Sequence, residues 1–422
     1  MECVIVSIGD ELTTGAITDT NSAWISDLLL GLGIATVMHI TVPDDIEAVK
    51  DVFMLSGERA KNVIVTGGLG PTEDDLTRDA FCEFAGVGTT LDHESIDKIK
   101  KIFDMLGREM TENNRKQAMI PDGANIIPNP IGTAPGFYAE AHGATYFFVP
   151  GVPRECRMMM EDTVAPVLKG MDRDATYRIR VFRTFGMTES QLDTELSDLS
   201  LPGGVKLGYR AVYPEIHVKL LARAKTEEEA ESLLEQASAG VRERIGEVIY
   251  SEDGNGLPEV VLDLLKEKGK MLATAESCTG GLVAKRITDV PGSSDGFERG
   301  FVTYTNRAKQ ELLGVSSETL EKHGAVSSET ALEMASGALE RSGADIAVAI
   351  TGIAGPTGGT EEKPVGTVHI ALADEDGTWE NRFNFSRGDR TQVRELTAQA
   401  ALEIVRRRLI KKDLPSMIGK GR

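Results

Sequence analysis

Residues 274–281 read Thr274-Ala275-Glu276-Ser277-Cys278-Thr279-Gly280-Gly281, and this stretch decides the fold of the C-terminal part. It follows the apolar run Met271–Ala273 and precedes the helix-compatible run Leu282–Arg286. This order predicts a strand-to-helix turn that carries a serine hydroxyl. The two glycines allow a ligand to approach the backbone closely. A purely structural turn is the alternative for this motif taken alone.

Two more segments strengthen the functional interpretation. The segment Tyr304-Thr305-Asn306-Arg307-Ala308-Lys309 supplies a candidate lysine base. The loop Thr351-Gly352-Ile353-Ala354-Gly355-Pro356-Thr357-Gly358-Gly359 is rich in glycine, as anion-binding turns are. A hydroxyl, a lysine and a glycine-rich loop together indicate hydrolysis of a small phosphorylated substrate.

Composition indicates a globular protein of two or three domains. The chain has 422 residues, of which 41% are hydrophobic and 27% charged. Its formal charge of −20 argues against a general nucleic-acid binder, which needs a basic face. The four cysteines are scattered, which fits a reducing cytoplasm, and we expect a cytoplasmic protein. No stretch resembles a signal peptide or a membrane span, so no membrane partner is expected.

The first expected domain, residues 1–168, alternates strands with helices. The strand candidates are Cys3–Ile8, Thr36–Ile40, Val63–Thr66 and Tyr146–Val149, and the helix candidates are Thr20–Leu32, Ile46–Arg59 and Asp75–Phe84. Such alternation favours a mostly parallel sheet covered by helices on both faces. Ligands bind these sheets at the carboxyl ends of the strands. The loops at Gly9, Gly67–Thr72 and Pro150 are expected there.

Two further domains follow. Residues 169–250 read as a small α+β module in β-α-β-β-α order, in which Thr188 is the expected cap of a short helix. This module has no Gly-x-x-Gly loop, so we interpret it as a spacer or dimerisation module and not as an RNA binder. The polar linker 251–256 leads into a second α/β domain, residues 256–422. The run Met158–Met160 is expected to be the buried start of a helix.

The residues resemble one family over nearly the whole chain. The C-terminal match comprises residues 274–281, 290–294, 297–309, 323–327, 351–359, 361–368 and 388–390, and the N-terminal match comprises residues 9–11, 21, 66–79, 114–118 and 128–136. These motifs are similar to those of the competence/damage-inducible protein A (CinA) family in its two-enzyme form. The stretch Glu11–Gly15 departs from the pattern but leaves Asp10 and Glu11 intact.

The resemblance implies three domains and two activities. It implies an α/β protein with an N-terminal three-layer domain similar to molybdopterin-binding domains, a small α+β module and a C-terminal α/β amidohydrolase. That amidohydrolase would deamidate nicotinamide mononucleotide to nicotinate mononucleotide and ammonia, with no cofactor. The N-terminal domain would hydrolyse ADP-ribose with a divalent metal ion. The alternatives are a non-catalytic molybdopterin or nucleotide binding module and an interaction protein of DNA uptake or repair. We expect a homodimer.

Amide hydrolysis needs a nucleophile, a proton carrier and oxyanion donors. Ser277 is the candidate nucleophile and Lys309 the candidate base, provided that its pKa is lowered, and Tyr304 is a third catalytic candidate. Cys278 is the rival nucleophile, but its neighbour Ser277 can face the substrate only if Cys278 faces away. The substrate-binding candidates of this domain are Thr279, Gly280, Gly281, Asn306, Thr351, Gly352, Gly355, Gly358 and Arg390.

Carboxylates cluster near the glycine-rich turns of the first domain. Asp10, Glu11, Asp74 and Asp75 are the candidate metal ligands, because pyrophosphate cleavage commonly uses a divalent cation held by oxygen ligands. Capping of a helix is the alternative role of Asp74 and Asp75, and Asp79 is expected to be structural. The candidates for substrate binding are Gly67, Gly68, Gly70, Thr72 and Asn21.

Overall fold

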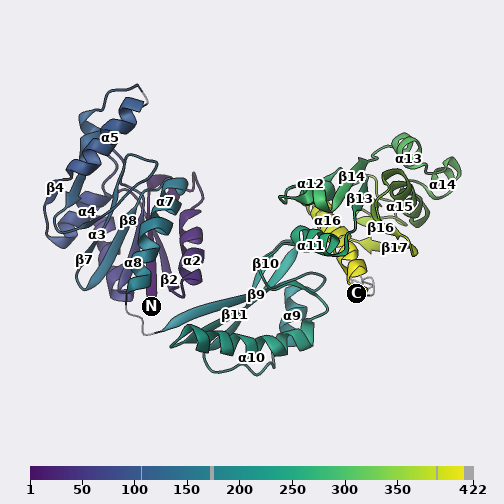
Figure 1. The fold of residues 1–422 in the computed structure, drawn as a ribbon, viewed down its shortest axis with the longest axis horizontal. Helices are drawn as coiled ribbons and strands as arrows, with labels where there is room; N and C mark the ends of the chain where they lie inside the picture. Colours follow the sequence, from purple (N-terminus) through teal and green to yellow (C-terminus); the bar gives the residue numbers. More distant parts are fainter. Residues whose placement is uncertain (106, 172–174, 386–387, 413–422) are drawn as a thin grey trace. The chain divides into compact units, whose positions relative to one another are not determined.

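The computed structural model describes residues 1–105, 107–171, 175–385 and 388–412, so the last ten residues of the expected third domain lie outside the described part. The chain divides into two compact units. The first comprises Met1–Ile179, Pro202–Val205 and Leu221–Glu235, and the second comprises Arg180–Leu201, Lys206–Leu220 and Gln236–Arg422. Figure 1 shows the N-terminal domain of the first unit in purple and blue and the C-terminal domain in green and yellow.

The first unit is built on a six-stranded sheet of order β2-β1-β3-β8-β7-β6. The first four strands in this order are parallel to one another: β2 (Ala35–Val42), β1 (Glu2–Ile8), β3 (Asn62–Thr66) and β8 (Ala144–Val149). Strand β7 (Gly136–Ala141) pairs antiparallel with β8, and β6 (Asn125–Ile127) pairs antiparallel with β7. Alternate residues of β1 enter two separate cores: Val4 and Val6 pack on one face, and Cys3 and Ile5 on the other. Burial on both faces is typical of a parallel sheet between helix layers.

Helices cover each face of this sheet. One core contains Val49 and Phe53 of α3 (Ile46–Arg59) and Phe81 of α4 (Thr77–Ala85), and the other contains Ile25 and Leu29 of α2 (Asn21–Gly31). The remaining elements are α1 (Asp10–Thr13), β4 (Thr89–Leu91), α5 (His93–Met105), α6 (Glu112–Lys116), β5 (Met119–Pro121), α7 (Pro153–Met159), a π-helical turn (Met160–Val164) and α8 (Ala165–Gly170).

The prediction that Met158–Met160 begin a helix was wrong. Helix α7 begins at Pro153, whose fixed backbone angle suits a first helical position, and ends at Met159. Met159 and Met160 are nevertheless fully buried, as expected for residues that fill a core.

The middle region contains β9 (Thr176–Thr184), α9 (Glu189–Leu196), β10 (Val205–Val212), β11 (Glu215–Ala224), α10 (Glu227–Ile245) and β12 (Ile249–Ser251). Its sheet has the order β10-β11-β9-β12. Thr188 caps α9 in a capping box with Gln191, as predicted.

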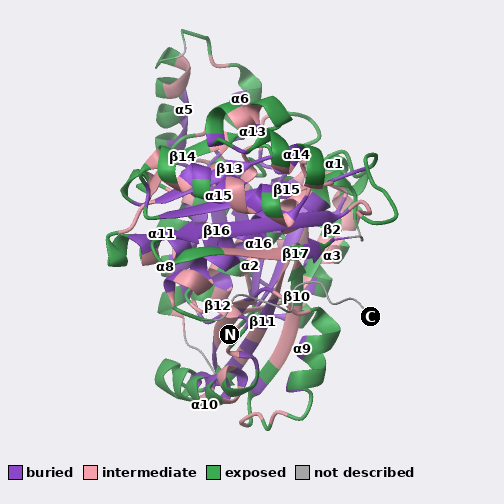
Figure 2. Cartoon of the chain, turned by 90° about the vertical axis from the view of Figure 1, so that its right-hand side faces the viewer, coloured by how far each residue is buried: buried purple, intermediate pink, exposed green. Residues whose placement is uncertain are grey.

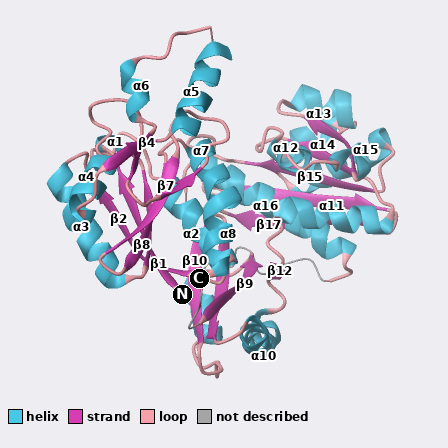
Figure 3. Cartoon of the chain, turned by 60° about the vertical axis from the view of Figure 1, so that its left-hand side comes forward, coloured by secondary structure: helices cyan, strands magenta, loops and turns pink. Residues whose placement is uncertain are grey.

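The C-terminal domain has a five-stranded sheet of order β14-β13-β15-β16-β17. Three strands are parallel to one another: β14 (Phe297–Val302), β13 (Leu272–Glu276) and β15 (Ile346–Gly352). Strand β16 (Thr367–Asp374) pairs antiparallel with β15, and β17 (Gly377–Asn384) pairs antiparallel with β16. Figure 2 shows β16 buried along its length, and Figure 3 shows helices flanking the strands.

The two faces of this sheet differ in side-chain size. Ile346 and Val348 of β15 join a core of large residues with α11 (Leu257–Lys268) and α16 (Arg390–Leu409). Ala347 and Ala349 face a core of small residues under α15 (Ser328–Ser342). The other elements are α12 (Leu282–Thr288), a 3-10 turn (Ser293–Asp295), α13 (Asn306–Leu313) and α14 (Ser317–His323). The predicted fold class, α/β at both ends with a small α+β module between, is confirmed.

Candidate active sites

The serine of the opening motif lies where β13 gives way to α12. Ser277 follows the last residue of β13, and its backbone N–H donates to Ile350 O at 3.0 Å. Gly280 and Gly281 have φ of 62° and 92°, a left-handed conformation that favours glycine. They reverse the chain into α12 and leave the hydroxyl at the carboxyl end of the sheet.

Sequence reasoning missed Glu276, which holds this turn in place. Its buried carboxylate accepts hydrogen bonds from the backbone N–H groups of Val283 (3.0 Å) and Ala284 (2.8 Å) in the first turn of α12. A carboxylate satisfies these unpaired donors and the positive end of the helix dipole. An acidic residue at the end of a strand, directly before a helix, was the available signal.

Lys309 reaches Ser277 from the first half of α13. Its Nζ donates to Ser277 Oγ at 3.0 Å, to Thr303 O at 2.8 Å and to Tyr304 O at 3.5 Å. The side chain is 1% exposed, and within the described part of the chain no carboxylate forms an ion pair with it. Burial lowers the pKa of Lys309 to about 8, because the ammonium loses hydration without gaining a counter-charge. A substantial neutral fraction therefore exists near physiological pH.

The neighbouring thiol has the opposite character. Cys278 is buried, and burial raises its pKa to about 12. A thiol that ionises only at such pH is a poor nucleophile near neutrality. The turn thus places the hydroxyl beside the lysine and the thiol in the core.

A guanidinium links two other predicted residues at the rim. Arg390, the first residue of α16, donates to Gly355 O at 2.9 Å and to the Tyr304 hydroxyl at 3.0 Å. Tyr304 is 58% exposed, so its ring stands open to solvent beside the Lys309 helix. Asn306 is also exposed, at the start of α13.

The structure gives the other C-terminal candidates different surroundings. Thr351 and Gly352 belong to β15 and not to the loop, and the Thr351 hydroxyl donates to Ala325 O at 2.6 Å. Gly355 and Gly358 lie in the loop, with φ of 80° and 89°. Thr279 is fully buried, and its hydroxyl has no hydrogen-bond partner in the described part of the chain.

A cavity of about 520 Å³ opens at the carboxyl ends of β1, β3 and β8 in the first unit. Of the N-terminal candidates, seven line this cavity: Glu11, Asn21, Gly67, Gly68, Gly70, Asp74 and Asp75. Asp10 and Thr72 lie beside it and contact the lining instead. Asn21 Nδ2 ties two of the loops together, since it donates to Thr66 Oγ1 at 3.2 Å and to Gly151 O at 2.8 Å.

The cavity lining is acidic. Its carboxylates are Glu11, Asp19, Asp44, Asp74, Asp75 and Glu155, and no lysine, arginine or histidine is among the lining residues. Most of these carboxylates accept internal hydrogen bonds: Asp19 from Ser7 and Ser22, Asp44 from the backbone of Asp10, Asp74 and Asp75 from Thr72, and Glu155 from Asn129. Glu11 and Asp74 lie close enough to Asp44 to raise its pKa, so these three carboxylates are the candidates for holding a cation.

Asp44 is a member of this group that sequence reasoning missed. Its carboxylate accepts from the Asp10 N–H at 2.9 Å, and its own N–H donates to Asp10 Oδ1 at 3.3 Å. Burial raises the pKa of Asp44, and the nearby charges of Asp10 and Glu11 raise it further. Among the described residues, no group of three His, Cys, Asp or Glu side chains is already arranged around a metal position. A cation here would therefore take other ligands from phosphate and water, as Mg²⁺ commonly does.

Comparison with known proteins follows the same three regions. Residues 255–409 match the family model "CinA C-terminal domain", residues 4–170 match "Probable molybdopterin binding domain", and residues 179–251 match "Damage-inducible protein CinA KH domain". The CinA-like protein of Geotalea uraniireducens is 42% identical over 412 residues, which cover 97% of this chain and 98% of that protein. The chain belongs to the CinA family.

The chain is also similar to other proteins. The CinA-like protein of Citrifermentans bemidjiense is 44% identical over 412 residues, again 97% of this chain and 98% of the relative. Among solved structures, the competence/damage inducible protein CihA from Agrobacterium tumefaciens is 50% identical and covers 35% of this chain and 91% of its own, with a TM-score of 0.35. The match of the middle region to a KH model was not anticipated, because this sequence has no Gly-x-x-Gly loop there.

Within the described residues, no helix combines the length and the apolar character that crossing a membrane requires.

Proposed function

We propose that this CinA-family protein is a bifunctional pyridine-nucleotide hydrolase whose C-terminal domain deamidates nicotinamide mononucleotide to nicotinate mononucleotide and ammonia. The observation that carries the proposal is the 3.0 Å hydrogen bond between Lys309 Nζ and Ser277 Oγ, made by a buried lysine whose pKa is lowered to about 8. A lysine in this state can act as a base for a serine nucleophile near neutral pH.

The proposed reaction has two steps. Neutral Lys309 accepts the proton of Ser277 while Oγ bonds to the carboxamide carbon, and the resulting ammonium then protonates the departing nitrogen as the C–N bond breaks. Ammonia leaves, and nicotinate remains esterified to Ser277. Lys309 next takes a proton from water, whose oxygen attacks the ester carbon, and the proton returns to Ser277 Oγ as the ester bond breaks. Nicotinate mononucleotide is released.

Substrate contacts are assigned to the rim of this site. Arg390 has five fixed donors and already bridges Tyr304 and the glycine loop, so it suits the phosphate of the nucleotide. The loop at Gly355 and Gly358 can present backbone N–H groups to the same group. We assign the exposed Tyr304 ring to contact with the pyridine.

For the N-terminal domain we propose metal-dependent hydrolysis of ADP-ribose to AMP and ribose 5-phosphate. A pyrophosphate is anionic, and the cavity offers it carboxylates and no basic side chain, so the substrate requires an accompanying cation to bind. Glu11, Asp44 and Asp74 would hold that cation. A divalent ion, when bound, supplies charge compensation and a more acidic water. Gly67, Gly68 and Gly70 line the same cavity and are the proposed contacts of the phosphates. A binding module without turnover is the alternative.

Ammonia release from nicotinamide mononucleotide tests the first activity. Ser277→Ala should abolish it and leave substrate binding intact, whereas Cys278→Ala should retain substantial activity. The reverse pattern would make this a thiol enzyme. AMP release from ADP-ribose, measured with a divalent cation and after chelation, tests the second activity. Tight binding of ADP-ribose without AMP release would favour the binding module.

A further inference from the structure

The first turns of α16 connect three parts of the C-terminal site. Asp389 caps this helix, and Arg390 and Arg394 stand one turn apart, so their side chains share a face. Arg390 holds Gly355 and Tyr304, as described above. Arg394 donates to Thr279 O through Nη2 at 2.7 Å and Nε at 3.3 Å, which clamps the turn that follows Ser277. The position of α16 therefore influences the positions of Gly355, Tyr304 and the turn at Thr279.

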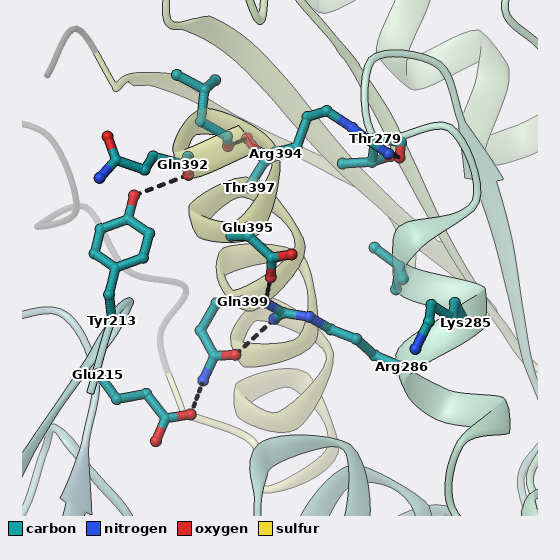
Figure 4. A network of polar contacts seen from close by, with 12 residues as sticks. Tyr213, Glu215, Thr279, Lys285, Arg286, Gln392, Arg394, Glu395, Thr397 and Gln399 are labelled. Atoms are coloured by element: carbon teal, nitrogen blue, oxygen red, sulfur yellow. Dashed lines mark hydrogen bonds and ion pairs between the residues drawn. The ribbon is translucent and has the colours of Figure 1, made fainter. Parts of the chain in front are cut away.

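The hairpin between β10 and β11 contacts the same helix. The Tyr213 hydroxyl donates to Gln392 O at 2.8 Å, and Gln399 Nε2 donates to Glu215 Oε1 at 2.9 Å. Figure 4 shows both contacts, with the two hairpin residues reaching one side of α16 and Arg394 directed toward Thr279. Residues from the middle region thus contact the helix that organises the site.

The contact continues into α12, the helix that follows the Ser277 turn. Arg286 of α12 donates to Gln399 Oε1 at 2.9 Å and pairs with Glu395 (Figure 4). Gln399 is 2% exposed, so both ends of its amide need partners, and Arg286 and Glu215 supply them in one orientation only. Glu215, Gln399 and Arg286 form a continuous chain from the hairpin to α12.

The hydrophobic core crosses the same boundary. Phe185 and Tyr250, from the middle region, belong to one core cluster with Leu257 and Val261 of α11 and with α16. Such packing fixes the end of β9 and the strand β12 of the middle region on the C-terminal domain. A flexible spacer would have its own core and a polar connection.

We propose that Glu215 and Tyr213 are positioning residues for the C-terminal active site, which they orient through Gln399, α16 and α12. The middle region is then part of the deamidating unit and not only a spacer or dimerisation module. This inference rests on the proposed function for its kinetic test. It concerns the placement of the Ser277 turn, so it also has a structural test.

An exchange of side chains between positions 215 and 399 in the full-length protein tests the chain of contacts. Gln399→Glu places a second carboxylate opposite that of Glu215. It should lower kcat for deamidation about tenfold with little change in KM, because a small displacement of the Ser277 nucleophile is costly. Adding Glu215→Gln to this variant makes position 215 the amide donor and position 399 the carboxylate acceptor. The double variant E215Q/Q399E should therefore recover most of the rate. Glu252→Gln, which removes the partner of Arg242 in the middle region, is the matched control. Loss without rescue, or an equal loss in the control, would overturn the proposal.

Tyr213→Phe provides a second, milder variant, since its ring is 53% exposed and only one hydroxyl is lost. It should lower kcat by about twofold to fivefold, in line with one modest hydrogen bond. The matched control is Tyr209→Phe on β10, whose hydroxyl lies near Asp193. Equal rates for the two variants would count against a role for Tyr213.

Hydrogen exchange separates this proposal from the proposed function. Gln399→Glu should speed amide exchange in residues 277–288, and E215Q/Q399E should restore protection, whichever substrate the protein uses. Wild-type protein that releases no ammonia would refute the deamidase and leave the exchange result to decide the positioning. Unchanged exchange in Gln399→Glu would refute the positioning even in an active enzyme.

Discussion

Deamidation should increase with pH through about pH 8. Lys309 must be neutral to accept the Ser277 proton, and burial lowers its pKa from the ordinary 10.5 to about 8. The amine is protonated below that pKa and free above it. Activity is therefore present above about pH 8 and is lost as the pH falls through this value.

The lowered pKa sets the size of the increase. With a pKa of about 8, roughly one tenth of the lysine is neutral at pH 7 and about nine tenths at pH 9, so kcat/KM should increase about tenfold and then level off. A lysine with the ordinary pKa would give an increase of about a hundredfold over this range and no plateau. The presence of a plateau therefore distinguishes a buried base from a solvated one.

Initial rates of ammonia release between about pH 7 and pH 9.5, at constant ionic strength, measure this profile. The phosphate of the substrate is already dianionic over most of this range. Cys278→Ala should give the same profile, since the thiol pKa of about 12 cannot produce an inflection near 8. A flat profile, or a rate that still climbs steeply at the highest pH, would refute Lys309 as the lowered-pKa base.

Three further predictions concern stability and the acidic cavity. Between about pH 8 and 10.5 the side chain of Lys309 binds more protons in the unfolded chain than in the folded one, so the free energy of unfolding should increase with pH. From pH 8 to pH 10, the free energy of unfolding of wild type should increase by about 2 kcal/mol more than that of the inactive variant Lys309→Met, as measured by denaturant titrations. Parallel curves of stability against pH would contradict this prediction. Asp44→Asn should raise Tm while lowering AMP release, because it removes a partly buried charge, and the repulsion of that charge by Asp10 and Glu11, together with a cation ligand. A normal rate would remove Asp44 from the cation site. Gly68→Ala should destabilise the first unit by more than Gly123→Ala, by roughly 1–3 kcal/mol, since both have positive φ but only at Gly68 would a Cβ overlap Thr77; equal losses would show that the close contact is harmless.

The partnership of Ser277 and Lys309 was predictable from local sequence. Each residue follows a strand, and β13 and β14 are parallel neighbours, so their carboxyl ends meet at one edge of the sheet. The burial of Lys309 was not predictable in this way. Its own helix, Asn306–Leu313, is polar, and the Ser277 hydroxyl that the buried Lys309 contacts lies 32 residues earlier in the sequence.

Two differences from expectation are explained by strand pairing. Asp44 follows β2 without any glycine to mark the loop, yet β2 and β1 are parallel neighbours, so the same rule of carboxyl ends could have found it. Thr351 and Gly352 were read as part of the glycine loop. Antiparallel pairing with β16 extends β15 through both, because Thr351 lies opposite His369 and Gly352 opposite Val368. Pairing partners far along the chain decide where such a strand ends.

The two sites meet an anionic substrate with opposite electrostatics. The charged side chains that line the cavity of the first unit are all carboxylates, so we expect a phosphate to bind there only with cations that offset both sets of negative charges. The C-terminal site carries Arg390 and Arg394, which contact backbone carbonyls there, so its own side chains can bind a phosphate. The formal charge of −20 belongs to the whole chain and does not reveal this difference between the two sites. We therefore expect a metal requirement for the proposed pyrophosphate hydrolysis and none for the proposed deamidation, because different side chains line the two sites.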